Sequence, residues 1–365
     1  MRNSMIRIAF VIPGDLSLPT GGYAYDRAVI RLLPQAGVEA LHVALPGSYP
    51  NPSAADLDDT AAINASLPAD CILLIDGLAY GAMPEELIRR FNRRIVALCH
   101  HPLALENGIS PEQAAALHHS ESAALALAEH VIVTSPLTAK ILAGDFGVAR
   151  DKITVAEPGT ARKSRAMGSK SDVVNMLAVG SIVPRKGYGV LVEALHGLKR
   201  RNWKLRIAGT ARSLETVNAL RDQIRLSGLD GHIRLLGAVP DRDLDHLFET
   251  ADLFVMSSLF EGYGMVLGEA LQRGLPIVTT TGGAASETVP DGAGLKVPPG
   301  DVPALRKALD DALADPGLRA RLAEAAHRAG QNLPTWEDTA RIIAGALQAL
   351  SGNGPNLVSP ASKGP

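Results

Sequence analysis

Short runs of apolar residues alternate with longer amphipathic segments along most of the chain. In the first half this pattern predicts strands at residues 6–12, 40–44, 71–76, 95–99, 130–134 and 153–156, and helices at 23–36, 85–92 and 112–129. Strands that are apolar at nearly every position are typical of parallel sheets covered by helices on both faces. The pattern therefore predicts a doubly wound α/β domain.

The same alternation restarts after an interruption. Residues 159–172 read GTARKSRAMGSKSD, a small and basic stretch without apolar periodicity, which we interpret as an interdomain linker. Beyond it we expect strands at 173–179, 204–208, 233–236, 253–256 and 276–279, with helices at 187–199, 213–227, 242–250, from Gly264 and at 302–314. Helical segments at 317–332 and 335–350 follow, and the Gly-, Pro- and Ser-rich tail at 351–365 is expected to be disordered.

Composition and charge narrow the class of protein. A chain of 365 residues with 46% hydrophobic residues exceeds one typical core, which favours two domains. The formal net charge of −2 does not suggest the basic surface of a nucleic-acid binder. Cys71 and Cys99 are too few for a disulfide framework, so a reducing compartment is the expectation.

Membrane segments are not predicted. The apolar run near the start is only about six residues long, and no later run approaches the roughly 20 residues that a spanning helix needs. We expect a cytoplasmic protein, and peripheral contact with the inner face of a membrane stays open. The arginines at 89, 90, 93 and 94 favour a solvated face, and a patch for a membrane or an acidic partner is the alternative.

Ligands of doubly wound sheets bind in the loops that follow the strands. The loop and helix start at 257–269 combine Gly262 and Gly264, which allow close backbone approach, with helix amides that attract anions. Glu261 and Glu269 offer carboxylates to the vicinal hydroxyls of a hexose and a ribose. The alternative is a polar turn followed by an ordinary helical glutamate.

Cations and further glycines occur in other loops of this kind. Arg185 and Lys186 lie between a strand and a helix, where a pyrophosphate leaving group would need cations, although a solvated basic turn fits as well. Gly21 and Gly22 follow the first strand and could offer amides to a phosphate, or serve only the loop. The segment TGGAASE at 281–287 is a second candidate loop for an anion or a sugar.

Two histidines follow the strand at 95–99. Adjacent residues such as His100 and His101 cannot easily share one metal, and no second Cys/His cluster is evident, so we expect no metal. A histidine that donates to a sugar hydroxyl or a phosphate is favoured over a structural histidine of the loop.

Together these segments resemble the retaining glycosyltransferase family 4, over about residues 6–350. The resemblance is strongest at 257–269, where two glutamates with seven residues between them follow the family's pattern, with an EGYG opening like the family's EGFG. PRKG at 184–187, TGGAASE at 281–287 and VIVTS at 131–135 add to it.

The resemblance implies the GT-B fold, two Rossmann-like doubly wound domains facing each other across a cleft. It places an acceptor-binding domain at 1–165, a nucleotide-sugar-binding domain at 170–332 and a helix at 333–350 that crosses back.

The resemblance also implies roles for individual residues. Glu261 would contact the donor sugar, Glu269 the ribose, and Lys186 with Arg185 the diphosphate. The remaining implied donor-binding residues are Gly21, Gly22, Ser181, Leu235, Leu236, Gly262, Tyr263, Gly264, Met265 and Val266. His100 falls at the family's histidine near the reacting sugar, with His101 as a competing assignment. Ser181 departs from the family, where many members carry an arginine, and Arg185 is the candidate replacement.

The implied activity is transfer of a hexosyl unit, with retention and without a metal or other cofactor, from a UDP- or GDP-sugar to a hydroxyl. The acceptor would be a glycan, a lipid-linked saccharide or a small molecule, and the short first domain with its loop at 47–67 favours a small acceptor or a glycan end. The alternatives are an epimerase or a phosphorylase on the same fold, or a binding protein without catalysis.

Overall fold

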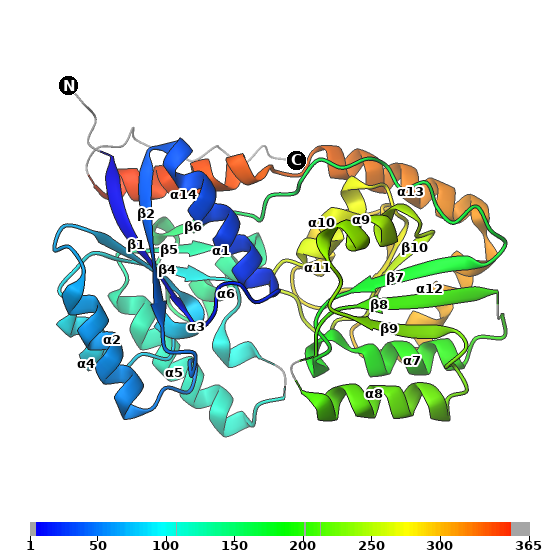
Figure 1. The fold of residues 1–365 in the computed structure, drawn as a ribbon, viewed down its shortest axis with the longest axis horizontal. Coiled ribbons are helices and arrows are strands. Elements are labelled where there is room, and N and C mark those ends of the chain that lie inside the picture. Colours follow the sequence, from blue (N-terminus) through cyan, green and yellow to red (C-terminus); the bar gives the residue numbers. More distant parts are fainter. Residues whose placement is uncertain (1–4, 107, 201, 212, 352–365) are drawn as a thin grey trace. The chain divides into compact units, whose positions relative to one another are not determined.

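A computed structural model describes residues 5–106, 108–200, 202–211 and 213–351. The chain divides into two compact units. Unit 1 comprises the residues up to Leu105, Pro111–Gly159 and the residues from Trp336 on; unit 2 comprises Glu106–Ser110 and Thr160–Thr335. Each unit is built on its own parallel sheet with helices on both faces (Figure 1). The predicted doubly wound α/β fold is thereby confirmed.

The sheet of unit 1 has six parallel strands. In spatial order they are β2 (Val38–Leu45), β1 (Ile6–Pro13), β3 (Ile72–Asp76), β4 (Ile95–Cys99), β5 (His130–Val133) and β6 (Ile153–Val155). The helices of unit 1 are α1 (Gly21–Leu32), η1 (Leu33–Ala36), α2 (Ala54–Ser66), α3 (Gly77–Tyr80), α4 (Glu85–Arg90), η2 (Leu103–Leu105), α5 (Pro111–Leu127), α6 (Pro136–Gly144), η3 (Arg150–Lys152) and α14 (Trp336–Leu350).

Unit 2 repeats the plan with a different strand order. Its parallel strands run β12 (Gly294–Val297), β11 (Ile277–Thr280), β10 (Leu253–Met256), β7 (Val174–Val179), β8 (Trp203–Ala208) and β9 (Ile233–Gly237). Its helices are η4 (Pro184–Lys186), α7 (Tyr188–His196), α8 (Leu214–Leu226), α9 (Asp241–Glu249), α10 (Met265–Gln272), α11 (Ala285–Thr288), α12 (Val302–Ala314) and α13 (Pro316–Gln331).

Each strand order contains one point where the chain reverses its direction of winding. In unit 1 the reversal lies between the neighbouring strands β1 and β3, and in unit 2 between β7 and β10. Loops that leave the carboxyl ends of such a pair diverge to opposite faces and open a crevice in which ligands of this fold class bind. The fold therefore singles out the loops after β1, β3, β7 and β10.

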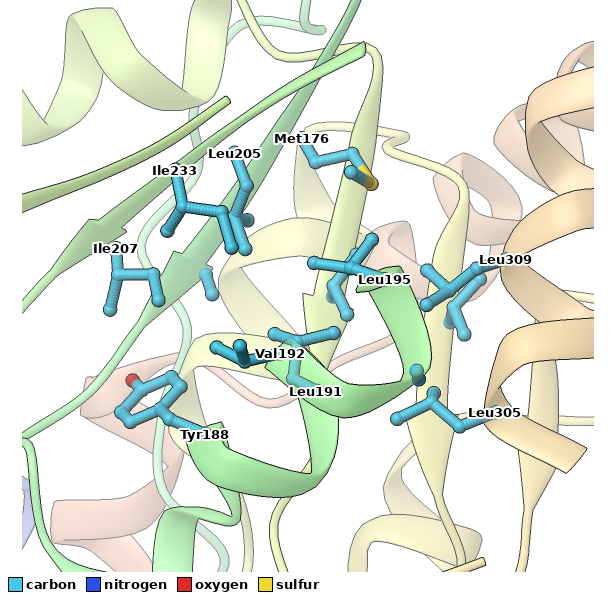
Figure 2. Packing of buried hydrophobic residues seen from close by; sticks show 14 of the residues in the cluster. Met176, Tyr188, Leu191, Val192, Leu195, Leu205, Ile207, Ile233, Leu305 and Leu309 are labelled. Carbon is cyan, nitrogen blue, oxygen red and sulfur yellow. The ribbon is translucent and has the colours of Figure 1, made fainter. Parts of the chain in front are cut away.

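Apolar side chains from both faces of the sheet hold unit 2 together. On one face Leu191 and Leu195 of α7 pack toward Leu205 of β8 and Leu309 of α12, all fully buried (Figure 2). On the other face a second cluster, which includes the fully buried Phe248, joins the sheet to α9, α10 and α13. Burying a side chain the size of leucine contributes about 1.5–3 kcal/mol, so this packing fixes where the strands end.

One segment of unit 1 differs from the sequence expectation. Residues 47–67, expected to be a loop, contain the helix α2. A capping box begins it, because the Ser53 side chain accepts from the Asp56 amide and the Asp56 carboxylate accepts from the Ser53 amide. The prediction was wrong because Thr60 is the helix's only fully buried residue, which leaves almost no apolar stripe to detect.

The basic segment before β7 also needs a correction. It is irregular, as expected, but from Thr160 on it belongs to unit 2 rather than to a free linker. Its cations are fixed on that unit: Lys163 pairs with Asp245 at 2.6 Å and Arg165 with Glu324 at 2.9 Å. Helix α14 packs against α1 within unit 1. The predicted disordered tail lies, beyond Ser351, outside the described residues.

Candidate functional site

In unit 2, the loops after β7 and β10 are tied to each other at the reversal point. The amide of Leu259 donates to the carbonyl of Arg185 at 2.7 Å, and the Ser257 hydroxyl donates to the carbonyl of Lys186 at 3.0 Å. Gly187 has a left-handed φ of +63°, and a Cβ there would lie 2.2 Å from the Ser257 carbonyl oxygen. Only glycine allows this approach, which brings the PRKG turn against the loop that carries Glu261.

Glu261 and Lys186 form an ion pair at the centre of this arrangement. Lys186 Nζ lies 2.7 Å from Glu261 Oε1, and Arg185 Nη1 lies 3.4 Å from Oε2. Burial of Glu261 favours its protonated form, but Lys186 and Arg185 outweigh burial and hold the pKa of this carboxyl below its ordinary value. The site therefore presents an ionised carboxylate together with a cation.

Small residues make room for the lysine. A Cβ at Gly180, directly after β7, would lie 3.0 Å from Lys186 Cε, so the lysine stem crosses the backbone of this glycine. The neighbouring Ser181 is half-buried and contributes no cation. Arg185 donates to the Phe260 carbonyl at 2.6 Å, so this guanidinium is partly engaged in holding the loop. This contact of Arg185 with the loop backbone was not predicted from the sequence.

Helix α10 begins immediately after the loop. Gly264 at its N-cap has a left-handed φ of +84° and no side chain that could cap the helix. The first amides of the helix, including those of Met265 and Val266, therefore face the loop without a capping side chain. Gly262 is half-buried, and Tyr263 is buried, its carbonyl accepting from Thr288.

Glu269 stands on the second turn of α10. It is half-buried, and burial raises the pKa of its carboxyl although Arg273 acts in the opposite direction. Arg273 donates to the backbone carbonyl of Glu269, and within the described residues no side chain or amide pairs with the Glu269 carboxylate. A partly desolvated carboxylate of this kind suits hydroxyl donors from a ligand.

The predicted loop at 281–287 supports the Glu261 loop. The Glu261 amide donates to Gly282 at 3.2 Å, and the Ala284 amide donates to Glu261 at 2.8 Å. A Cβ at Gly282 would meet the Leu259 carbonyl oxygen at 2.3 Å. These glycines therefore have a packing reason, and the predicted contact with an anion or sugar stays a prediction. Leu235 and Leu236 of β9 are half-buried, and Leu235 packs against the core. Their implied contact with the donor stays a prediction.

In unit 1, the ring of His100 follows β4 and lies beside the start of α1. A Cβ at Gly22 would lie 3.5 Å from His100 Cδ2, so of the two adjacent histidines His100 is the one whose ring borders Gly22. Gly21 and Gly22 are the first two residues of α1, behind the N-cap Thr20, and Gly21 is exposed. Tyr25 meets the His100 ring edge-on, with the ring centroids 5.1 Å apart.

Two carboxylates that the sequence analysis did not name also reach His100. His100 Nε2 lies 3.0 Å from Asp26 Oδ1 and 3.5 Å from Asp76 Oδ2. Burial lowers the pKa of the imidazole, but Asp26 and Asp76 reverse this and raise it to about 10. Two features of the sequence could have pointed to these carboxylates: Asp26 lies on the buried side of a helix, and Asp76 lies at the carboxyl end of a strand.

These three side chains also have the spacing of metal ligands. Their candidate ligand atoms lie within 4.8 Å of one another, and in the part of the chain that the structure describes they are the one such group. The expectation that the protein needs no metal stays a prediction. Cys71 and Cys99 are both buried and free.

The arginine cluster is largely used within unit 1. Arg89 pairs with Glu85 and Arg94 with Glu129, while Arg93 donates to the carbonyls of Asn64 and Leu67. These contacts agree with the solvated face predicted from the sequence. In the described residues no helix is both long and apolar enough to cross a membrane.

Comparison with known proteins gives a consistent result. Residues 160–329 match the family model described as "Glycosyl transferases group 1". The chain is 31% identical over 173 residues to the mannosylfructose-phosphate synthase of Agrobacterium fabrum, which covers 42% of this chain and 38% of that relative. It is 32% identical over 203 residues to a "GDP-mannose-dependent alpha-(1-6)-phosphatidylinositol monomannoside mannosyltransferase" of Mycolicibacterium smegmatis, covering 52% and 51%. The chain thus spans about half or less of the length of these curated relatives.

Solved structures resemble nearly the whole chain. The sucrose-phosphate synthase of Thermosynechococcus elongatus superposes with a TM-score of 0.81 at 21% identity, over 95% of this chain and 100% of that one. Anabaena HepE, solved in complex with UDP and glucose, gives 0.72 at 20% identity, over 94% and 100%. The fold is therefore GT-B, as the sequence resemblance implied.

Proposed function

We propose, from the premise that residues 160–329 belong to the group 1 glycosyl transferases, that this protein transfers a hexosyl unit from a nucleotide-diphosphate sugar to a hydroxyl acceptor. The observation that carries the proposal is the ion pair of Lys186 and Glu261, at 2.7 Å, at the reversal point of the sheet in unit 2. A cation and an ionised carboxylate held together there match the two parts of such a donor, its diphosphate and its sugar hydroxyls.

Lys186 serves the leaving group in this proposal. An ammonium group has three hydrogen-bond donors, so Lys186 can keep its contact with Glu261 and still meet oxygens of a diphosphate. The amides at the start of α10, which no side chain caps, add the positive electrostatic potential of the helix N-terminus. Both act most strongly when the bond from sugar to phosphate breaks and charge develops on the phosphate.

Glu261 and Glu269 would bind hydroxyl groups of the donor. Glu261 is ionised, because Lys186 and Arg185 hold its pKa low, and it accepts hydrogen bonds from the sugar. Glu269, whose carboxylate has no partner among the described residues, would accept from the ribose. No step of this scheme needs a metal, and we propose that the protein works without one.

Retention follows in the proposal from attack on the same face as the departing diphosphate. The bond to the leaving phosphate breaks first, and that phosphate accepts the proton of the acceptor hydroxyl. The acceptor would be a glycan, a lipid-linked saccharide or a small molecule, and UDP and GDP are both open as the donor nucleotide. We also propose a cytoplasmic location, in keeping with two buried thiols.

A donor screen tests the proposal. Purified protein is incubated with UDP- and GDP-hexoses, with and without candidate acceptors, and release of nucleoside diphosphate is measured. Lys186→Ala should lower turnover at least about 100-fold, the usual loss for one oxyanion-stabilising group. Lys199→Ala, which changes an exposed lysine just beyond the end of α7, is the matched control and should leave turnover unchanged.

The outcomes separate the alternatives. Full turnover by a folded Lys186→Ala or Glu261→Ala variant would contradict the site. Conversion of the donor sugar without any acceptor would indicate an epimerase, and dependence on free phosphate would indicate a phosphorylase. Binding of donors with no turnover under any acceptor would leave a binding protein.

A further inference from the structure

Three chain segments converge on one ring nitrogen in unit 1. Asp26 comes from the buried face of α1, Asp76 from the last position of β3, and His100 from the residue after β4. Both carboxylates approach His100 at Nε2, at 3.0 and 3.5 Å. The side chains of Asp26 and Asp76 are 0% and 5% exposed, so water screens neither of them.

We propose that Asp26 and Asp76 are positioning residues that hold His100 as an imidazolium, so that this histidine acts as a fixed cation and hydrogen-bond donor, never as a base. The structural half of this proposal concerns unit 1 alone. Its catalytic half rests on the proposed glycosyl transfer.

The charges of the cluster favour the imidazolium. Two carboxylates buried beside each other repel, and removing them from water is costly unless a positive charge accompanies them. A proton on His100 supplies that charge without any group from outside the chain. The pKa values agree with this. Burial and Asp76 raise the pKa of Asp26 to about 6, although His100 acts in the opposite direction. The two carboxylates raise the pKa of His100 to about 10, although burial acts in the opposite direction.

The ring is also fixed in orientation. Tyr25 packs edge-on against it and donates its own hydroxyl to the Ala156 carbonyl at 2.9 Å, so the tyrosine cannot follow a turning ring. Asp76 is itself held, because its Oδ1 accepts from the Leu78 amide at 2.7 Å while Oδ2 faces the histidine. The titratable groups that face His100 are therefore Asp26 and Tyr25 of α1 and Asp76 of β3.

This arrangement decides what His100 can do to a substrate. Both nitrogens of an imidazolium donate, and Nε2 is committed to the carboxylates, so Nδ1–H is the atom left for a ligand oxygen. A ring that is already protonated cannot take the proton of an acceptor hydroxyl. That proton must leave by another route, which agrees with its transfer to the departing phosphate in the proposed reaction.

A titration of the ring tests the structural half without any activity. The ring carbon–proton resonances of His100, assigned with His100→Gln, are followed against pH in heteronuclear NMR spectra of the full chain. The wild-type ring should stay protonated well beyond neutrality, with a midpoint of about 10. In Asp26→Asn the midpoint should fall by about 1 to 3 pKa units, the effect of losing one close opposite charge.

The pH dependence of turnover tests the catalytic half. Wild-type kcat should stay level across the neutral range, whereas kcat of Asp26→Asn should fall as pH rises through the lowered pKa and return toward the wild-type value below it. A purely structural role of Asp26 would lower kcat equally at every pH.

Matched variants keep the test decisive. Asp59→Asn removes an exposed carboxylate of the same unit and should alter neither the titration nor the pH profile. If Asp26→Asn does not fold, Asp76→Asn replaces it, since an asparagine can still accept from the Leu78 amide. A wild-type His100 midpoint near the ordinary value, or one unmoved in both variants, would overturn the proposal.

Two further results are distinguishable. If the ring titrates as expected but no donor is ever turned over, the proposed function fails and the imidazolium stands. If EDTA abolishes turnover, and Mn²⁺ restores it and broadens the His100 resonances, the three side chains are metal ligands and the inference fails.

Discussion

At the scale of single residues, unit 1 concentrates buried ionisable groups near the loop that follows β4. Besides the His100 cluster, Glu121 of α5 is 2% exposed and accepts from the Leu103 amide at 2.9 Å. Burial raises the pKa of this carboxyl to about 8, although the amides of Ala104 and Leu103 oppose the shift. Glu121 therefore fastens the turn η2, a few residues beyond His100.

The raised pKa of Glu121 makes the stability of unit 1 depend on pH. The folded state holds the proton up to about 8, whereas the unfolded chain releases it near 4.5, so its stabilising contribution is complete below 4.5 and is lost as pH rises to about 8. Glu121→Gln cannot titrate, so its free energy of unfolding should fall less over this window. Urea unfolding of both proteins at about pH 5 and pH 8 measures the difference; parallel losses would contradict the assignment.

At the scale of elements, the turn between β7 and α7 depends on one close backbone approach. Gly187 combines a φ of +63° with a Cβ position 2.2 Å from the Ser257 carbonyl, whereas Gly228 has a φ of +64° with no atom within 4 Å. The two glycines thus share a left-handed backbone conformation and differ in their surroundings. Comparing them separates the geometry of the site from the general need for glycine.

Alanine at these two positions should have unequal effects. Gly228→Ala should cost about 1–2 kcal/mol of unfolding free energy, the strain of a left-handed residue with a Cβ. Gly187→Ala should cost more and also weaken nucleotide binding, because the loop of Lys186 must move away from Ser257. Urea unfolding and calorimetric titration with UDP and GDP give the two quantities; equal costs and unchanged binding would rule out the close-approach explanation.

The helix α2 provides a second test at this scale. Because its capping box is its clearest local signal, Ser53→Ala should lower the free energy of unfolding by about 1 kcal/mol. Ser66→Ala, at the other end of the helix, removes only an exposed hydroxyl bonded to the Ile63 carbonyl and serves as the control. A similar loss in both variants would show that the cap adds nothing specific.

Helices and strands were predictable where local pattern decides them. The strand at 95–99 and the helix at 302–314 agree with the structure to the residue, because a continuous apolar run and an amphipathic repeat bounded by Asp301 leave little choice. The helix α2 was not predicted, since almost none of it is fully buried. The contacts of Asp26 and Asp76 with His100 were not predicted for another reason: they join residues 74 and 24 positions apart, and no local pattern encodes contacts over such a separation. The loops with Lys186 and Glu261 were found because strand ends are visible in sequence.

At the scale of the whole molecule, each described apolar cluster lies within a single unit. One cluster extends over β1–β6 and the helices α2 to α6 of unit 1, and two clusters cover the two faces of the unit 2 sheet. Each unit therefore has a core of its own and the size of an ordinary domain.

Separate cores predict separate unfolding. Calorimetry of the full chain should resolve two transitions, and a saturating nucleotide should raise only the one that belongs to unit 2. A fragment of residues 160–335 should reproduce that transition. One cooperative transition in the full chain, together with an unfolded fragment, would show that the units depend on each other for stability.

The discontinuous composition of unit 1 has a consequence for synthesis on the ribosome. Chains emerge from the N-terminus, and domains generally fold as units as they appear. Nearly all of unit 2 is one continuous stretch, whereas unit 1 waits for α14, whose Ile343 and Leu347 are fully buried. The unit whose translation starts first is thus completed last. A nascent chain stalled before Trp336 would therefore expose the surface of α1 that α14 covers. Chaperones and proteases can distinguish unfinished chains from finished ones by this exposed surface.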